Sequence, residues 1–283
     1  MDIAIVGSGT VGTALGVAWV RAGHRVVAAT GRGATAERRA TWLPTTPLLA
    51  VSEAVARAEV VAIGVPDDAL ASTIAEVAGA VTPGAWVLHL SGAQGLGVLD
   101  PIAASGARVL ALHPLQTFAD VAGALDVLPG CAIAVTALDE EGFAMGERLA
   151  RDLGGRPFRL DDAQRPLYHA AAVFASNYLV AVSSAGEALF ALAGVPEALA
   201  AMRPLQEATL ANVHRLGPRE ALTGPAVRGD AGTIDGNLRA IAEVAPHLLA
   251  PYVELCRTSL SVAGDRLSPS GRAAVEEVLS RWS

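Results

Sequence analysis

The chain has 283 residues, of which 52% are hydrophobic and 17% charged, and its formal net charge at pH 7 is −7. This length predicts two domains that each bury a core of their own, and this composition excludes a disordered chain. The negative charge, together with the lack of any block of basic residues, argues against nucleic acid as a partner.

The types of residue that are missing exclude further chemistries. All 21 basic residues are arginine, so neither a phosphate-binding P-loop lysine nor a Schiff-base lysine is possible. Cys131 and Cys256 show no metal or redox spacing, and the six histidines are scattered, so we expect no metal site. The first 20 residues lack the basic start and the cleavage site of a signal peptide, which predicts a cytoplasmic protein with free thiols.

The first predicted element is a strand at 3–6 that runs into three glycines, spaced G-x-G-x-x-G, and then into a helix over 10–22. In such a turn the first glycine permits the tight bend, the second lets the backbone approach a pyrophosphate, and the third lets helix and strand pack closely. The helix N-terminus then favours the negative charge of the pyrophosphate. The alternative is a glycine turn with only a structural role. The residues predicted to contact a dinucleotide here are Gly7, Ser8, Gly9, Thr10, Val11 and Gly12.

The second predicted strand, 25–30, ends in Thr30-Gly31-Arg32. Sites for NAD place an acidic residue at this point to bind the ribose 2′-hydroxyl, whereas this chain has no acid before Glu37. A hydroxyl and a guanidinium suit a 2′-phosphate, so Thr30 and Arg32 favour NADP. Alternatively, Arg32 is a solvated loop residue.

The next predicted elements continue an alternation of strands and helices. A helix is expected around 52–58 and a strand at 59–65. Val65, which ends this strand, and the following Pro66 fit the floor under the nicotinamide ribose. Asp67 could equally cap the helix expected at 68–80. The strands at 85–90, 108–112, 131–137 and 156–160, with a helix at 139–153, complete a doubly wound, mostly parallel α/β sheet over residues 1–160.

From residue 161 the pattern is helical to the end. Helices are expected at 162–193, 196–216, 246–262 and 269–282. One further helix, capped by Thr233, is expected between the second and third of these. This predicts a Rossmann-type dinucleotide-binding domain over 1–160 and an all-helical domain over 161–283. The most apolar run, 170–182, is interrupted by Asn177, so we interpret it as a buried helix rather than a membrane span.

Several short motifs carry a resemblance to a known family. They are the glycine turn, His89-Leu90-Ser91-Gly92, the run 112–118, Tyr168-His169 with Ser176-Asn177, and the stretch 223–230. In these the chain resembles a family of unknown function that pairs a Rossmann-like NADP domain with a helical C-terminal domain. More distantly it is similar to deazaflavin-dependent NADP reductases and pyrroline-5-carboxylate reductases. The resemblance implies this fold and NADP but leaves the substrate open.

The same resemblance shows where this chain departs from better-known relatives. The 6-phosphogluconate and ketopantoate dehydrogenases use a catalytic lysine on the helical domain, and this chain has no lysine. If the chain is an oxidoreductase, another residue must donate the proton.

Candidates for that chemistry follow the carboxyl ends of the strands, where ligands bind in doubly wound sheets. Ser91 and His113 each lie just past such an end, and His113 can give a proton to a substrate as hydride arrives. Alternatively, His113 is hydrogen-bonded to a neighbouring loop. His89 lies within a strand and is expected in the core.

A second group of candidates lies in the helical domain. His169 and Ser176 share one face of the long helix at i and i+7, with Asn177 adjacent. They are predicted to bind substrate and nicotinamide, or else to pair with a neighbouring helix. In the turn-rich stretch, Thr223 and Arg228 are predicted to hold a substrate carboxylate or phosphate. Alternatively, Arg228 pairs with Asp230.

These candidates predict an NADP-dependent oxidoreductase that transfers a hydride between NADP(H) and a small carbonyl or imine substrate or a redox carrier. The alternative is an NADP(H)-binding sensor or scaffold without turnover. Because apolar helices of this kind pair across two-fold axes, a homodimer through the helical domain is expected, with no membrane partner.

Overall fold

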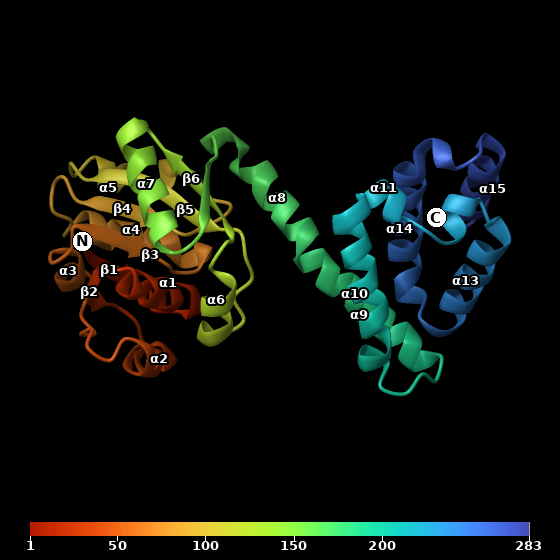
Figure 1. Ribbon diagram of the computed structural model, residues 1–283, viewed down its shortest axis with the longest axis horizontal. Coiled ribbons are helices and arrows are strands. Elements are labelled where there is room, and N and C mark those ends of the chain that lie inside the picture. The colour runs from red at the N-terminus through yellow and green to blue at the C-terminus, as the bar shows by residue number, and fades with distance from the viewer. Residues whose placement is uncertain (283) are drawn as a thin grey trace. The chain divides into compact units, whose positions relative to one another are not determined.

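The computed structural model describes residues 1–282 and divides into two compact units, Met1–Ser176 and a unit that begins at Asn177. Each unit is described by itself (Figure 1).

The first unit contains a seven-stranded sheet in the order β2-β1-β3-β4-β5-β6-β7. The five strands β1 to β5 are parallel, β6 is antiparallel to β5, and β7 is parallel to β6. This confirms the predicted fold class of the domain. The strands are β1 (Asp2–Val6), β2 (Arg25–Ala29), β3 (Val60–Ile63), β4 (Trp86–His89), β5 (Arg108–Pro114), β6 (Ala132–Ala137) and β7 (Arg156–Arg159).

Helices cover both faces of this sheet, which explains why the central strands β1, β3 and β4 are almost entirely buried. In β1, Ile3 and Ile5 pack on one core with α1, α6 and α7, while Ala4 and Val6 pack on a second core with α3 and α4. Successive strand residues thus alternate between two buried layers (Figure 1). The helices of this unit are α1 (Thr10–Arg21), α2 (Ala34–Trp42), α3 (Val51–Val55), α4 (Asp67–Ala78), α5 (Asp100–Ala103), α6 (Val121–Val127), α7 (Glu140–Asp152) and α8 (Arg165–Ala175), with 3-10 turns η1 (Leu96–Leu99) and η2 (Asp162–Gln164).

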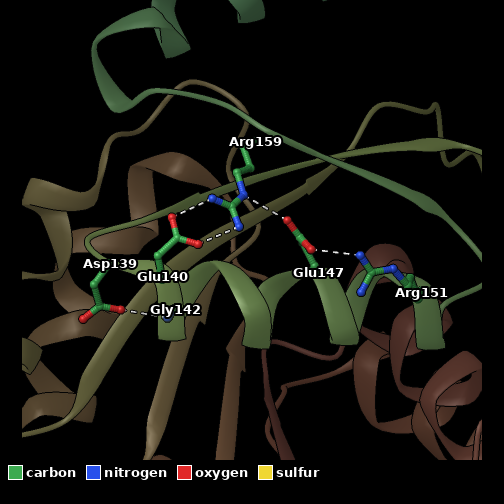
Figure 2. Close-up of polar contacts among 6 residues, drawn as sticks. All are labelled: Asp139, Glu140, Gly142, Glu147, Arg151 and Arg159. Atoms are coloured by element: carbon green, nitrogen blue, oxygen red, sulfur yellow. Dashed lines mark hydrogen bonds and ion pairs between the residues drawn. The ribbon is translucent and has the colours of Figure 1, made fainter.

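A side-chain cap begins α7, and a group of ion pairs connects this helix to β7 (Figure 2). Asp139 caps α7 by accepting a hydrogen bond from the Gly142 amide at 2.8 Å. Arg159 at the end of β7 donates to both carboxylate oxygens of Glu140, at 2.7 and 2.9 Å, and to Glu147 at 3.0 Å. These hydrogen bonds hold the pKa values of both glutamates below their usual range. The forked contact fixes the edge strand against the helix, although pairs this exposed contribute little to stability.

The helix expected over 162–193 is interrupted at Ser176. Its dihedrals there, φ −124° and ψ −68°, leave the helical region, so α8 ends at Ala175 and α9 begins at Asn177. The division into units falls at this residue. The predicted domain boundary at 160 coincides with the end of β7, whereas the first unit continues through α8.

The second unit is all helical and has a core of its own. Ile234 and Leu238 of α13, Leu260 of α14 and Val275 of α15 are all buried in this core. Asp230 caps α13 by accepting from the Thr233 amide, so the predicted cap at Thr233 is wrong by one turn. The helices are α9 (Asn177–Leu192), α10 (Ala198–Leu216), α11 (Pro218–Ala221), α12 (Pro225–Arg228), α13 (Ala231–Val244), α14 (Leu249–Ala263) and α15 (Pro269–Ser280), with 3-10 turns η3 (Pro246–Leu248) and η4 (Gly264–Arg266).

The interpretation of 170–182 as a buried helix is wrong for the single chain. None of the residues of α9 is buried, although its composition is strongly apolar. Within the described part of the chain, the stretch Asp162–Leu192 is long and apolar enough to cross a membrane by length and composition alone. The apolar residues of this stretch therefore form a surface that the rest of the chain does not cover.

Candidate functional site

The glycine turn is built around Gly7, whose φ of +94° is a conformation that favours glycine. The Gly7 amide donates to the Thr30 hydroxyl at 3.0 Å, and the Ser8 amide and hydroxyl both donate to the Thr30 carbonyl at 2.8 Å. The turn is thus tied to the end of β2. Ser8 as a whole is fully buried, and its amide and hydroxyl are both used within the turn, so its predicted contact with a cofactor stays a prediction.

The other two glycines differ in what surrounds them. A Cβ built on Gly12 would lie 2.3 Å from the Gly7 carbonyl oxygen, so only glycine permits α1 to approach the turn this closely. A Cβ on Gly9 would meet nothing within 4 Å. Gly9 is the N-cap of α1, and neither a side-chain cap nor an acidic residue occupies the first turn, which begins at Thr10 and Val11. The helix N-terminus is therefore open to an anion beside Gly9.

A cavity of about 610 Å³ lies next to this turn. It combines the predicted Gly7, Thr30, Arg32 and Val65 with residues that the sequence analysis did not single out. Pro66 is the N-cap of α4, whose residues form the opposite wall. The complete lining is Val6, Gly7, Thr30, Gly31, Arg32, Leu49, Ala50, Val51, Val65, Ala69, Ser72, Thr73 and Glu76.

The arginines after β2 have different roles. Arg32 lines the cavity, and Arg38 on α2 donates to the Ser8 carbonyl at 3.4 Å. Arg39 instead donates to the Thr46 carbonyl at 2.9 Å and holds the following loop. Arg38 and Arg39 follow Arg32 closely in the sequence, but α2 was not predicted, and only this helix brings position 38 back over the glycine turn.

A second group of side chains surrounds the loop after β4. The Ser91 hydroxyl accepts from the amides of Ala93 and Gln94 and donates to Asp67 at 3.0 Å. Asp67 therefore contacts this loop, and it lies inside α4 rather than capping it.

His113 and His169 come together beside this loop, as predicted for two of the candidate catalytic residues. A Cβ on Gly92 would lie 2.8 Å from His113 Nε2 and 3.0 Å from His169 Nδ1, so both rings pack against the bare backbone of Gly92. His113 Nδ1 is 2.7 Å from the hydroxyl of Tyr168. Gly92 and Tyr168 belong to motifs that are visible in the sequence, but their roles depend on these contacts between distant parts of the chain.

Arg165, the first residue of α8, is fully buried beneath the same loop. Its guanidinium donates to the carbonyls of Ser91 and Gln94 and, at 3.0 Å, to the Thr136 hydroxyl. One turn earlier, Asp162 accepts from the Leu96 amide at 2.8 Å. The start of α8 is thus fastened to the sheet domain, which places Tyr168 and His169 beside His113.

Burial and the charge of Arg165 determine the protonation state of His113. Desolvation, followed by repulsion from Arg165, lowers the pKa of His113 to about 4. The ring is therefore neutral at pH 7, so any proton that His113 gives to a substrate must come from the neutral imidazole. His89 is in the core as expected, where burial lowers its pKa to about 3.

The remaining predicted site residues lie where the chain leaves the first unit or beyond that point. Ser176 ends α8, whereas Asn177, Thr223 and Arg228 belong to the second unit. Arg228 is exposed, with a guanidinium nitrogen 3.8 Å from a carboxylate oxygen of Asp230, in line with the ion-pair alternative. The roles of these four residues stay predictions.

The sheet order and the glycine turn define a Rossmann-type nucleotide-binding domain. Residues 1–114 match a Rossmann-like domain, and residues 131–259 match the domain of unknown function DUF2520. The chain pairs these two domains, which confirms the resemblance found in the sequence. No curated protein matches the chain.

Solved structures resemble the chain over nearly its whole length. The proposed NADP oxidoreductase BF3122 from Bacteroides fragilis is 26% identical, with a TM-score of 0.80 over 92% of this chain and 98% of that one. Protein TM1727 from Thermotoga maritima is 23% identical, with a TM-score of 0.71 over 93% and 98%. The NADP-bound pyrroline carboxylate reductase from Plasmodium falciparum is 10% identical, with a TM-score of 0.61 over 100% and 98%. The last two likenesses show the fold.

Proposed function

We propose that the protein is an NADPH-dependent oxidoreductase that passes a hydride to a C=O or C=N bond of a small substrate or to a redox carrier. The observation that carries the proposal is the cavity shared by the glycine turn, the end of β2 and Val65, because this arrangement suits a dinucleotide. His113 lies within the last residues of β5, not just past the strand as the sequence predicts, and His169 lies near it. The reacting end of the cofactor is expected at this edge of the sheet. The likeness to the Bacteroides fragilis protein and to reductases supports the same activity.

The phosphate-bearing form of the cofactor is favoured by the residues at the end of β2. Thr30 accepts a hydrogen bond from Gly7, and a hydroxyl that accepts one bond can still donate another to a phosphate. Arg32 adds a positive charge at the end of β2, and the next acidic residue along the chain, Glu37, lies on α2. The carboxylate that lines the cavity, Glu76, belongs to α4 and not to the end of β2. A 2′-phosphate is therefore better accommodated here than a bare ribose that needs a carboxylate.

A titration of the wild type and of Arg32→Ala with NADPH and NADH tests this assignment by nucleotide fluorescence. A charge-assisted hydrogen bond contributes roughly 1.5–3 kcal/mol, so the variant should lose about tenfold to a hundredfold in affinity for NADPH and none for NADH. Arg57→Ala, which removes an arginine outside this cavity, is the matched control and should bind both nucleotides normally. Failure of the wild type to bind either nucleotide would contradict the proposal.

Turnover is tested by a screen of ketones, aldehydes and cyclic imines for substrate-dependent oxidation of NADPH. With a substrate in hand, replacing both His113 and His169 by alanine should abolish turnover while NADPH still binds. Unchanged turnover would remove both histidines from the mechanism. No oxidation by any compound, with a protein partner recovered only in the presence of NADPH, would favour the sensor or scaffold alternative.

The proposal includes a homodimer that forms through α9 and α10 in the cytoplasm. Val180 and Leu205 are 68% and 63% exposed, and burying such side chains contributes about 25 cal/mol for each Å² removed from water. A second copy of the chain offers an equally apolar surface, which supports it as the occupant.

A further inference from the structure

The contact between His113 and Tyr168 joins two elements far apart in the chain. His113 lies near the end of β5 and Tyr168 on the first turn of α8, with His113 Nδ1 2.7 Å from the Tyr168 hydroxyl. The two rings meet edge to face at 5.5 Å, and Phe158 of β7 contacts the tyrosine ring from a second direction. The phenol is thus held between two strands and cannot readily turn away from the imidazole.

The hydrogen bond assigns the tautomer of His113. Burial raises the pKa of Tyr168 to about 12, so its hydroxyl keeps its proton at neutral pH. A phenol is a much stronger acid than the N–H of a neutral imidazole, and a bare ring nitrogen is a stronger base than the phenol oxygen, so the phenol is the donor in this hydrogen bond. Donation from the phenol to Nδ1 uses the hydroxyl proton, and the ring proton of the neutral histidine is then on Nε2.

Arg165 affects the charge that His113 and Tyr168 can each carry. The buried guanidinium lowers the pKa of His113, and it also lowers the pKa of Tyr168 against the larger effect of burial. The cation therefore opposes a positive charge on the imidazole and stabilises a negative charge on the phenol. Among the other charged or titratable groups around His113, His169 acts in the same direction as Arg165, and Asp67 acts against it.

The proton on Nε2 lies on the side of the ring that faces Gly92 and His169. Because a Cβ on Gly92 would come within 2.8 Å of Nε2, glycine keeps this edge of the ring free of a protein side chain. Nδ1 of His169 is buried beside it with no hydrogen-bond partner, which is a costly state that a ligand would relieve. His113 Nε2 and His169 Nδ1 thus both lie beside Gly92, where one ligand atom could contact both rings.

We propose that Tyr168 is a positioning residue and proton source that acts through His113, and that the substrate atom served by this pair is a carbonyl oxygen. This inference rests on the proposed hydride transfer and deepens it. As hydride from NADPH adds to the carbonyl carbon, the C=O π electrons move to oxygen, which takes the proton from His113 Nε2. Nδ1 takes the proton of Tyr168, which leaves a phenolate. Nε2 then takes a proton from solvent and Nδ1 returns its proton to the phenolate, so the starting tautomer is restored. Overall the carbonyl compound, NADPH and one solvent H⁺ give the alcohol and NADP⁺.

The same arrangement selects against imines. A C=N bond accepts hydride readily only after it is protonated, which needs an acid stronger than a neutral imidazole. An alkoxide that forms together with hydride transfer is basic enough to take a proton from the neutral ring. The imidazole is neutral before and after the step, as the neighbouring Arg165 requires.

Spectra of the free, full-length protein labelled with ¹⁵N-histidine test the tautomer directly. Two-bond ¹H–¹⁵N correlations should show His113, assigned from a His113→Gln variant, as a neutral ring with its proton on Nε2 at every pH from 5 to 8. In Tyr168→Phe the ring should become a mixture of tautomers. Tyr252→Phe, which removes a phenol bonded to Asn237 in the second unit, should leave the His113 signals unchanged. A wild-type ring with its proton on Nδ1, or one charged at pH 6–7, would overturn the proposal.

A kinetic arm uses the ketone or aldehyde that the screen identifies. Tyr168→Phe should lower kcat by about a hundredfold or more while the Kd for NADPH stays within about twofold, since a proton donor contributes typically 10²–10⁴-fold. An unchanged kcat, or turnover of imines alone by the wild type, would overturn the relay. Loss of NADPH binding by the wild type would instead contradict the proposed function, while the tautomer measurement would stand.

Discussion

At the scale of single residues, the sheet domain holds a cation and neutral imidazoles away from water. Arg165 is fully buried, and its guanidinium donates hydrogen bonds to carbonyl groups and a hydroxyl. Because these acceptors are neutral, the positive charge of Arg165 is only partly compensated. Its field and the loss of hydration keep His89 and His113 neutral. We conclude that electrostatics near the carboxyl ends of β4 and β5 exclude further positive charge.

A pH dependence of stability follows from His89. Its pKa is about 3 in the fold, against an ordinary value of 6.5, so between these values the unfolded chain binds a proton that the native protein does not. Stability must therefore fall as the pH decreases below about 6.5. His89→Gln should reduce the slope of the unfolding free energy against pH, between pH 4 and 6, by up to about 1.4 kcal/mol per pH unit. Denaturant titrations measure this, and above pH 7.5 the two slopes should agree. An identical slope at acid pH would contradict the assignment.

At the scale of elements, two glycines of the turn have different roles, one in packing and one in binding. Gly12 is needed for the contact of α1 with the Gly7 carbonyl, whereas Gly9 has open space where a side chain would be. Gly12 is therefore needed for packing in the cofactor-free protein, whereas Gly9 is needed when the cofactor is bound.

Alanine at each position should separate these roles. Gly12→Ala must push α1 away from β1, and overpacking of this kind costs about 1–3 kcal/mol, which a lower midpoint of denaturation will show. Gly9→Ala should leave that midpoint unchanged and weaken NADPH about tenfold or more, because its methyl group would meet the pyrophosphate. Normal NADPH affinity of Gly9→Ala would place the cofactor elsewhere.

The elements that were predicted and those that were missed differ in how they are stabilised. All seven strands of the sheet were predicted. Most of them are apolar runs enclosed by turns and buried on both faces, whereas the edge strand β7 has an exposed arginine at each end and buries none of its residues. The helix α2 was missed: it buries none of its residues and has little apolar periodicity. It nevertheless brings Arg38 to the glycine turn, so a helix with a weak sequence signal contributes a site residue.

At the scale of the whole molecule, the second unit leaves an apolar surface uncovered. Met202 of α10 packs over Gly186 of α9, and Gln206 donates to Ser183, so these helices form a pair. The side chains on their outer faces, among them Val180 and Leu205, stay exposed. Patches of this kind mark association surfaces.

Light scattering at micromolar concentration should give twice the mass of one chain. Val180→Glu and Leu205→Glu together should give a single-chain mass with unchanged NADPH binding, because a charge in the centre of an apolar interface is not compensated. The exposed pair Arg203→Gln and Glu207→Gln on α10 is a control that should remain dimeric. A wild-type monomer that sediments with neutral lipid vesicles would favour a membrane as the partner of this surface.

The sequence by itself determined the α/β sheet, the helical second half and the glycine turn, because these depend on local periodicity and on the backbone freedom of glycine. It also identified His113 and His169 as candidates. Only the tertiary structure decided that Tyr168, Arg165 and Gly92 surround these histidines, and that Ser176 interrupts the long helix. The contact of His113 with Tyr168 joins residues 55 positions apart, and the pKa values of these side chains depend on burial and on charges that only the folded chain brings together.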